Sequence, residues 1–280
     1  MPQLGDADRA VLVAYRAYMA RRHFARTTIA ARMSASRRWV HDVPDWQATT
    51  FRTVEAWTGA LPISVRTQRN VLVSLRAFYK WALREGLTDH DPTALVDAPR
   101  LPTLLPRPAL EADIAMLLGE TNAELTAMVA LMSCLGLRCV EVANLRWCDV
   151  DLHDRWIFVL GKGRKERRLR MPASVVRLVA ALEGTDGPVF PGRYGDHRSP
   201  SRVSQMVSRA FRDAGIKRTT AHQLRHRAAT RGLELTGDLL AVRDMLGHES
   251  VATTQGYAQL VAGKAAALSE SIELPDSREE

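Results

Sequence analysis

Apolar residues recur every three to four positions through the first hundred residues, which is the spacing of amphipathic helices. We expect Asp6 or Asp8 to cap the first helix and Thr27 or Thr28 to cap the second, because these side chains accept hydrogen bonds from the first turn. Gly86 is expected to end the fourth helix. The four segments with this pattern are residues 6–22, 29–43, 49–61 and 64–86.

The fourth helical segment carries its apolar residues on one face and arginines over the rest. Arg66 and Arg69 lie among the polar positions. Residues 1–97 are therefore predicted to form a small basic helical bundle. The apolar face is expected to run through Val71, Leu75, Phe78 and Leu83.

A proline-rich stretch at residues 98–108 follows the bundle. Four prolines between residues 99 and 108 cannot continue a helix and favour an extended chain, so we interpret this stretch as a linker. A second domain is then expected over residues 109–280.

The second domain has a mixed pattern. Residues 155–161 and 165–172 have the composition of two strands joined by a glycine-containing turn, which predicts a β-hairpin. Gly136 is expected to end one helix. The predicted fold class is mainly α with a small β-hairpin or sheet. Helices are expected over residues 109–119, 122–135, 138–145, 174–184, 201–215, from 221 onwards, 239–246 and from 250 toward Ser271.

The chain has 280 residues, a formal net charge of +8 and a pI of about 9.8. This basic surplus favours a polyanionic partner, either nucleic acid or an anionic membrane surface. The three cysteines, Cys134, Cys139 and Cys148, lack the spacing of metal ligands and are expected to be free thiols. The sequence shows no signal peptide and no apolar run of membrane-spanning length, so a cytoplasmic protein without a membrane partner is predicted.

The segment TTAHQLRHRAA, residues 219–229, concentrates cations at a predicted helix start. Thr220 and Gln223 match a capping box, which would place His222 in the first turn with Arg225 on the same face. A helix start has unpaired N–H groups and partial positive charge, so this end is suited to a phosphate oxygen. His226 is expected to be a structural residue that turns inward.

Further positions along the chain add candidate chemistry. Arg138 follows Gly136 at a helix start, and Glu141, one turn on, can hold its guanidinium. Lys162 lies at the tip of the hairpin, with Lys165 near it. His248 follows the Gly247 helix end, and Tyr257 comes nine residues later. Each residue alone is more often a surface charge or a packing residue, and only the ordered set Arg138, Lys162, His222, Arg225, His248 and Tyr257 is informative.

In this ordered set the chain resembles the tyrosine recombinases, also called phage-integrase-type recombinases, which include the bacterial Xer proteins. The matching segments are GLRCVEVANL, LGKGRKERRLRMP, AHQLRHRAAT and LGHESVATTQGYAQL. The order of helical bundle, linker and second domain also matches, so the resemblance implies a SAM-like core-binding domain followed by a mixed α/β catalytic domain.

The resemblance implies a role for each matched residue. Tyr257 would be the nucleophile that forms a 3′-phosphotyrosyl bond with DNA. Arg138 and Arg225 would bind the non-bridging oxygens, and Lys162 would protonate the leaving 5′-oxygen. His222 would assist proton transfer at the tyrosine, and His248 would hydrogen-bond the phosphate. Fixed cations around the phosphate can replace metal ions, so no cofactor, metal or ATP is expected.

The resemblance also implies partners. Double-stranded DNA with specific core sites would be clamped between the domains, and a homo-tetramer would form through exchange of the C-terminal helix. The resemblance also makes Arg66, Arg69 and Lys165 candidates for contacts with DNA phosphates. Because the predicted bundle begins almost at residue 1, an arm-binding domain of the lambda type is not expected. Arg227, Arg231 and Glu234 occupy a stretch where relatives are expected to be more apolar.

Several functions remain open at this stage. The leading hypothesis is the integrase of a phage or other mobile element, and the alternative within the class is a Xer-type recombinase that resolves chromosome dimers. A DNA-binding regulator with an inactive site is the alternative from another class. A type IB topoisomerase, which uses related chemistry, is a further option.

Overall fold

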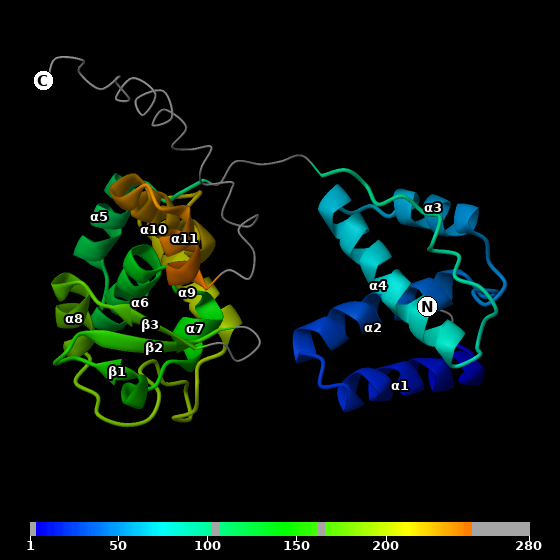
Figure 1. Cartoon of the computed structure of the whole chain (residues 1–280), viewed down its shortest axis with the longest axis horizontal. Coiled ribbons are helices and arrows are strands. Elements are labelled where there is room, and N and C mark those ends of the chain that lie inside the picture. Colours follow the sequence, from blue (N-terminus) through cyan, green and yellow to red (C-terminus); the bar gives the residue numbers. More distant parts are fainter. Residues whose placement is uncertain (1–3, 102–106, 162–165, 248–280) are drawn as a thin grey trace, which may run out of the picture. The chain divides into compact units, whose positions relative to one another are not determined.

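The fold is described from a computed structural model of the chain, in residues 4–101, 107–161 and 166–247. The chain divides into two compact units, residues 1–103 and 104–280 (Figure 1). Each unit has a separate hydrophobic core, so each is described by itself.

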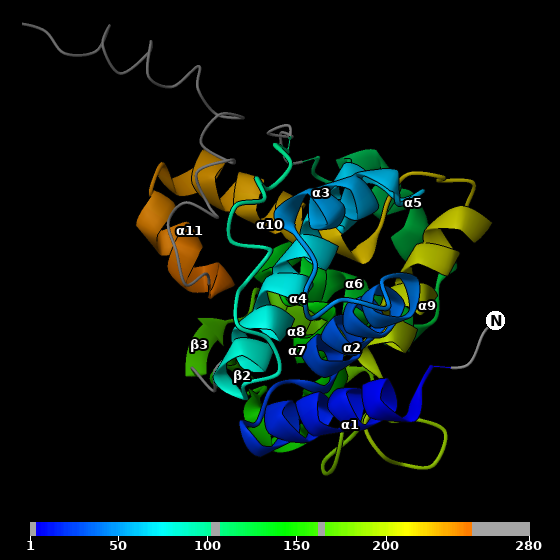
Figure 2. The same ribbon diagram turned by 90° about the vertical axis from the view of Figure 1, so that its right-hand side faces the viewer.

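The first unit is a bundle of helices. Figures 1 and 2 show α4 lying across α2, with α1 beside α2. Trp39, Trp46 and Tyr79 are fully buried between them. The Tyr79 hydroxyl accepts a hydrogen bond from Trp39 Nε1 at 2.8 Å and donates one to the Trp46 carbonyl at 2.7 Å. The core therefore buries large aromatic rings without leaving these polar atoms unpaired. The helices are α1 (Asp6–Arg21), α2 (Arg26–Asp42), α3 (Phe51–Ala60) and α4 (Val65–Arg84).

Two details of the predicted bundle are wrong. The cap of α1 is Gly5 and not Asp6 or Asp8. The cap of α2 is Ala25 and not Thr27 or Thr28. Both helices begin earlier in the sequence than the side-chain preference suggests. Leu83, predicted to face the core, is 43% exposed. The buried stripe of α4 is rotated because the helix packs against both α2 and α3. This stripe comprises Leu72, Leu75, Phe78, Tyr79 and Ala82, among others.

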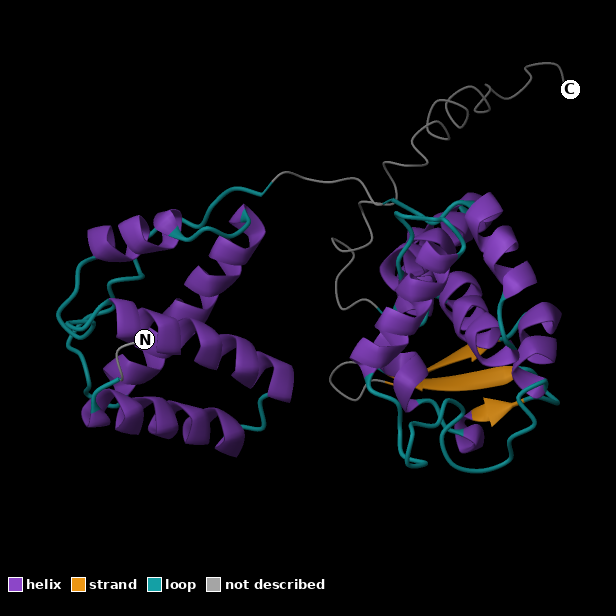
Figure 3. Ribbon diagram, turned by 180° about the vertical axis from the view of Figure 1, so that it is seen from behind, coloured by secondary structure: helices purple, strands orange, loops and turns teal. Residues whose placement is uncertain are grey.

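The second unit is mainly helical with a small sheet, which confirms the predicted fold class. Figure 3 shows the three strands together at one side of the helices. At the centre, α6 is buried on nearly all sides and packs against α8 and α10. The elements are α5 (Glu111–Glu120), α6 (Ala123–Leu135), α7 (Cys139–Asn144), β1 (Val150–Asp151), β2 (Trp156–Leu160), β3 (Glu166–Arg170), α8 (Ala173–Ala180), α9 (Pro200–Asp213), α10 (Ala221–Thr236) and α11 (Leu239–Leu246).

The sheet has the order β1-β2-β3 with antiparallel neighbours. The predicted hairpin of β2 and β3 is confirmed, with Trp156 opposite Arg170 and Leu160 opposite Glu166. Ile157 and Val159 are buried, so alternate residues of β2 face the core. The two-residue strand β1 was not predicted, because two residues are too few to show an alternating pattern.

Helix ends in the second unit follow their sequence signals in most places. Gly136 ends α6 in the left-handed region, with φ of 67°. Asp238 caps α11, since its Oδ1 accepts from the N–H groups of Leu240 and Ala241. The capping box at α10 is wrong: Thr220 does precede the helix, but its hydroxyl donates to Gln223 Oε1 at 3.2 Å and caps no backbone N–H.

The described helices include none that combines the length and apolar composition needed to cross a membrane.

Candidate active site

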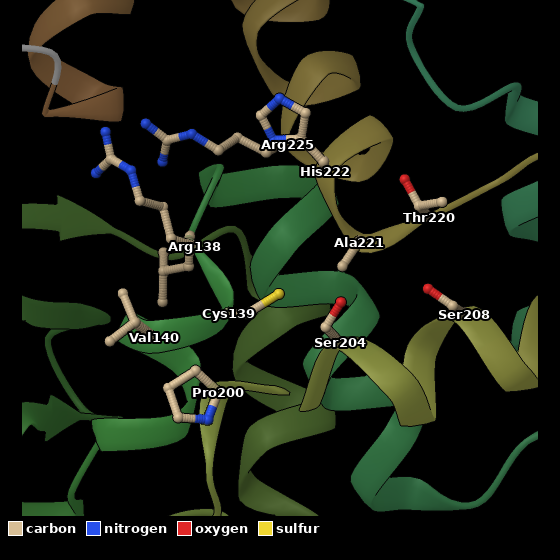
Figure 4. Close-up of a pocket in the computed structure, with 11 residues that line it drawn as sticks. Arg138, Cys139, Val140, Pro200, Ser204, Ser208, Thr220, Ala221, His222 and Arg225 are labelled. Atoms are coloured by element: carbon tan, nitrogen blue, oxygen red, sulfur yellow. The ribbon is translucent and has the colours of Figure 1, made fainter. Parts of the chain in front are cut away.

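The structure brings Arg138, His222 and Arg225 together beside one cavity of the second unit. Arg138 is the residue before α7, and His222 and Arg225 lie one turn apart near the start of α10. Figure 4 shows their side chains gathered on the same side of this cavity. The cavity has a volume of about 490 Å³ and is lined by Leu137, Arg138, Cys139, Val140, Pro200, Ser204, Ser208, Thr220, Ala221, His222 and Arg225.

The carboxylate of Glu141 lies against Arg138. Its Oε1 accepts from Arg138 Nη1 at 2.9 Å, and its Oε2 accepts from the Arg138 backbone N–H at 2.8 Å. The Glu141 side chain is only 1% exposed, whereas that of Arg138 is 33% exposed. Glu141 thus holds Arg138 through Nη1 and the backbone N–H, while part of the guanidinium remains accessible from the cavity.

Glu141 is ionised at neutral pH in spite of its burial. Burial by itself would raise the pKa of this carboxyl. The hydrogen bonds and charge of Arg167, followed by those of Arg138, outweigh burial and hold the pKa below its usual value. The site therefore contains a buried anion surrounded by cations.

Arg225 is almost fully buried, with 3% of the residue exposed. Its Nη1 donates to the Gly136 carbonyl, and its Nη2 donates to the Leu246 carbonyl at 2.7 Å. Nη1 also lies 3.9 Å from Glu141 Oε2. The guanidinium is therefore fixed in orientation at the wall of the cavity, where a planar fork of donors suits an anionic oxygen.

His222 and His226 form an edge-on pair, with ring centroids 4.2 Å apart. Burial, together with the charges of Arg225 and Arg138, lowers the pKa of His222. Burial, His222 and Arg225 lower the pKa of His226 to about 4. Both rings are consequently neutral at pH 7, and a neutral imidazole can accept a proton.

The C-terminal end of α11 lies against the same arginines. Leu246 and Gly247 present their carbonyls to Arg138 at 3.3 Å each, and Leu246 also accepts from Arg225. The carbonyl of Met245 accepts from Arg167 Nε at 2.9 Å. A helix C-terminus carries partial negative charge, so guanidinium groups stabilise it there.

Some predicted site residues lie outside the described part of the chain. These are Lys162, Lys165, His248 and Tyr257. Their chain neighbours are placed: Leu160 ends β2, Glu166 begins β3, and Gly247 ends α11. In the first unit Arg66 is exposed, and Arg69 donates to the Pro99 carbonyl at 3.3 Å.

Sequence reasoning missed Arg167 and the role of Arg227. Arg167 forms a two-bond ion pair with Glu141, and alternation along β3 could have placed it on the inward face with the buried Leu169. Arg227 forms a two-bond ion pair with Glu111 at 2.8 Å and so ties α10 to α5. No sequence signal marks this second pair.

The cysteines Cys134, Cys139 and Cys148 are free, as predicted. In the residues that the structure describes, no group of three or more His, Cys, Asp or Glu side chains is arranged to hold a metal ion.

The second unit is helical with a small antiparallel sheet. Two fixed arginines and a neutral histidine border its cavity, and such a site is suited to stabilising a phosphoryl transition state. The sequence profile of the phage integrase family matches residues 110–263. The tyrosine recombinase XerC of Xanthomonas campestris pv. campestris (strain B100) is 36% identical over 226 residues, which are 76% of this chain and 69% of that protein.

Similar folds occur among solved structures. A lambda integrase dimer bound to a COC′ core site matches with a TM-score of 0.74 and 17% identity, over 89% of this chain and 76% of that one. The XerA recombinase matches with a TM-score of 0.54 and 25% identity, over 95% of this chain and 100% of that one. The chain belongs to the phage integrase family and is a site-specific recombinase of the tyrosine class.

Proposed function

We propose that this recombinase cuts and rejoins double-stranded DNA through a covalent bond to Tyr257. The tyrosine oxygen attacks the phosphorus of one backbone ester, a 3′-phosphotyrosyl bond forms, and the bond to the 5′-oxygen breaks. The released 5′-oxygen takes up a proton and becomes a 5′-hydroxyl. A 5′-hydroxyl of a second strand then attacks the phosphotyrosine, the bond from phosphorus to the Tyr257 oxygen breaks, and the tyrosine regains its proton. This step regenerates a phosphodiester, so no ATP is consumed.

The observation that carries this proposal is the pair of fixed guanidiniums beside the neutral His222. Arg138 and Arg225 would bind the two non-bridging oxygens, where negative charge gathers in the transition state. Because both arginines are already oriented by Glu141 and by backbone carbonyls, little reorganisation is needed when the phosphate arrives.

The proton transfers are assigned to the remaining residues. Neutral His222 would accept the proton from the Tyr257 hydroxyl, whose ordinary pKa near 10 requires assistance at neutral pH. Lys162 would protonate the leaving 5′-oxygen, and His248 would donate a hydrogen bond to the phosphate. For Lys162, His248 and Tyr257 the support is their place in the family motifs.

The proposed partners are a pair of DNA core sites and further copies of the chain. Similar solved structures include a lambda integrase tetramer bound to a Holliday junction, which supports a homo-tetramer here, with the C-terminal segment exchanged between protomers. Arg66, Arg69 and Lys165 are proposed phosphate contacts. We place this activity in the cytoplasm of a bacterial host, where such DNA is found.

Two biological roles fit the proposed chemistry. Integration of a phage or other mobile element is our main proposal. Resolution of chromosome dimers is the alternative, and the 36% identity to a XerC protein favours it specifically. Recombination of candidate attachment-site pairs, compared with that of a chromosomal dimer-resolution site, separates the two roles.

The test of the chemistry is a suicide duplex that is nicked next to the cleavage site. The native chain should form a covalent protein–DNA adduct, and Tyr257→Phe should form none while still binding the duplex. Tyr194→Phe is the matched control, because Tyr194 is 87% exposed and should leave the adduct yield unchanged.

Other outcomes of this experiment point elsewhere. An adduct that persists in Tyr257→Phe would show that another residue is the nucleophile. Site binding by the native chain without any adduct would favour an inactive DNA-binding regulator. Relaxation of arbitrary supercoiled DNA, without a site requirement, would favour a type IB topoisomerase.

A further inference from the structure

We propose that Arg167 is a positioning residue, whose guanidinium fixes the buried Glu141 carboxylate and the end of α11 and thereby orients Arg138 at the cavity. Its consequence for catalysis rests on the proposed function, in which Arg138 binds the phosphate. The contacts of Arg167 themselves are independent of that function.

The Glu141 carboxylate accepts four hydrogen bonds, which fill the acceptor sites of its two oxygens. Oε1 accepts from Arg138 Nη1 and Arg167 Nη1, both at 2.9 Å. Oε2 accepts from the Arg138 N–H at 2.8 Å and from Arg167 Nη2 at 2.9 Å. Two of the four bonds come from Arg167, in the parallel geometry that only an arginine provides. Loss of Arg167 would leave the carboxylate with the two bonds from Arg138 alone, so half of its acceptor sites would lose their partners.

Arg167 acts through its neighbours, because it is not among the residues that line the cavity. Its side chain is 12% exposed, whereas that of Arg138 is 33% exposed. The buried carboxylate therefore lies between Arg138, on the side of the cavity, and Arg167, on the side of the interior. Arg167 therefore does not contact a substrate in the cavity, but through Glu141 it determines the orientation of Arg138.

Arg167 also joins three separate segments of the unit. It extends from β3, pairs with Glu141 of α7, and donates through Nε to the Met245 carbonyl at the end of α11. A Cβ on Gly247 would lie 3.0 Å from Arg167 Nη1, so the backbone approaches the guanidinium closely. In the sequence, β3 follows Lys162 and α11 precedes His248. Arg167 is therefore placed to fix the described segments next to both residues.

The test compares Arg167→Gln and Arg167→Lys with the matched control Arg168→Gln. Arg168 is exposed on the same strand, with its guanidinium 3.7 Å from the centre of the Trp156 ring, so this control removes the same charge from the other face. Single-turnover cleavage of the nicked duplex at saturating protein is measured beside the Kd for that duplex.

Arg167→Gln should slow cleavage about 100-fold, because small displacements of a positioning group have effects of that size. Arg167→Lys keeps a charge without the two-bond geometry and should slow cleavage about 10-fold. The Kd should change less than about 2-fold in both variants, and Arg168→Gln should cleave within about 2-fold of the native rate.

The pH profile provides a readout that a merely structural role would not move. Arg167 opposes the effect of burial on the Glu141 pKa, so its removal should raise that pKa. The acidic limb of the cleavage rate should then shift to higher pH in Arg167→Gln. Cleavage by Arg167→Gln at the native rate would overturn the proposal. A fall in cleavage rate that only matches the unfolded fraction of this variant, with the acidic limb of its pH profile unmoved, would also overturn it.

A titration without DNA separates this proposal from the proposed function. The Glu141 carboxyl carbon, followed by NMR, should titrate below the ordinary glutamate range in the native chain and higher in Arg167→Gln. If no adduct forms with the native chain but the titration shifts as expected, the proposed chemistry fails and the contact role of Arg167 stands. An unshifted titration overturns the role of Arg167.

Discussion

Glu141 and Arg225 are the charged residues that the core of the described chain buries almost completely. Burial of charge is costly, and buried ionic groups that are fully satisfied often add little to stability compared with apolar residues of similar size. Their retention is best explained by orientation: a guanidinium fixed inside the protein presents its donors to a phosphate without first losing side-chain freedom.

His226 gives a prediction at the scale of one residue. Its pKa is lowered to about 4 in the folded chain, so between about pH 4 and pH 6.5 the unfolded chain binds a proton that the folded chain does not. Stability must therefore rise with pH across this window and fall as the solution is acidified. On going from pH 7.5 to pH 5, the free energy of unfolding of His226→Gln should therefore fall by about 1–2 kcal/mol less than that of the native chain.

Urea unfolding followed by far-UV circular dichroism measures this difference in both proteins. At pH 7.5, His226 of the native chain is neutral in both the folded and the unfolded state. The stability of each protein at this pH is therefore the reference for its loss of stability at pH 5. An equal loss of stability on acidification in both chains would contradict the assignment of a neutral, partly buried His226.

Much of the site at the residue scale was predictable, because motif order places Arg138, His222 and Arg225 on two helix starts that the fold brings together. Arg167 was not predicted, because alternation along β3 places it on the same face as Leu169 but does not reveal that it has a buried partner there. The partner, Glu141, lies 26 positions away and becomes its neighbour only through packing.

Gly136 gives a prediction at the scale of elements, because it ends α6 and also contacts α11. Its φ is 67°, and an added Cβ would lie 2.5 Å from Leu246 Cδ2. Gly237 ends α10 with a φ of 66°, but nothing lies within 4 Å of its added Cβ. Replacement of Gly237 by alanine should therefore cost only the left-handed backbone strain, about 1 kcal/mol.

Gly136→Ala should cost about 2–3 kcal/mol more than the matched Gly237→Ala variant, because overpacking against Leu246 is added to the strain. It should also slow cleavage, since the Gly136 carbonyl accepts from Arg225. Thermal and urea unfolding of both variants measure the first effect, and nicked-duplex cleavage measures the second. Equal destabilisation of the two variants would show that Leu246 moves aside freely.

Element types were more predictable than element ends. Long periodic segments such as α4 and α9 match their expected ranges closely, because many apolar positions report on the same face. The cap of α2 was wrongly assigned to Thr27 or Thr28, because a capping preference of about 1 kcal/mol is easily outweighed by packing. The predicted start of α10 after Thr220 is confirmed, although the Thr220 hydroxyl caps no backbone N–H.

At the scale of the whole molecule, the formal charge of +8 predicts a strong dependence of DNA binding on salt. Each phosphate contact releases counterions, so the logarithm of the binding constant should fall linearly with the logarithm of salt concentration. Arg66→Gln should reduce the magnitude of this slope by about 1 if Arg66 contacts one phosphate. Fluorescence anisotropy of a labelled duplex at several salt concentrations measures the slope. An unchanged slope would remove Arg66 from the proposed interface.

The unequal distribution of indole rings between the two units affects how unfolding of this protein is observed. Trp39, Trp46, Trp57 and Trp81 belong to the first unit, and only Trp147 and Trp156 belong to the second. Intrinsic emission will be dominated by melting of the first unit. A tryptophan emission curve can thus show an intact protein while the unit that carries Arg138 and His222 has already lost its structure.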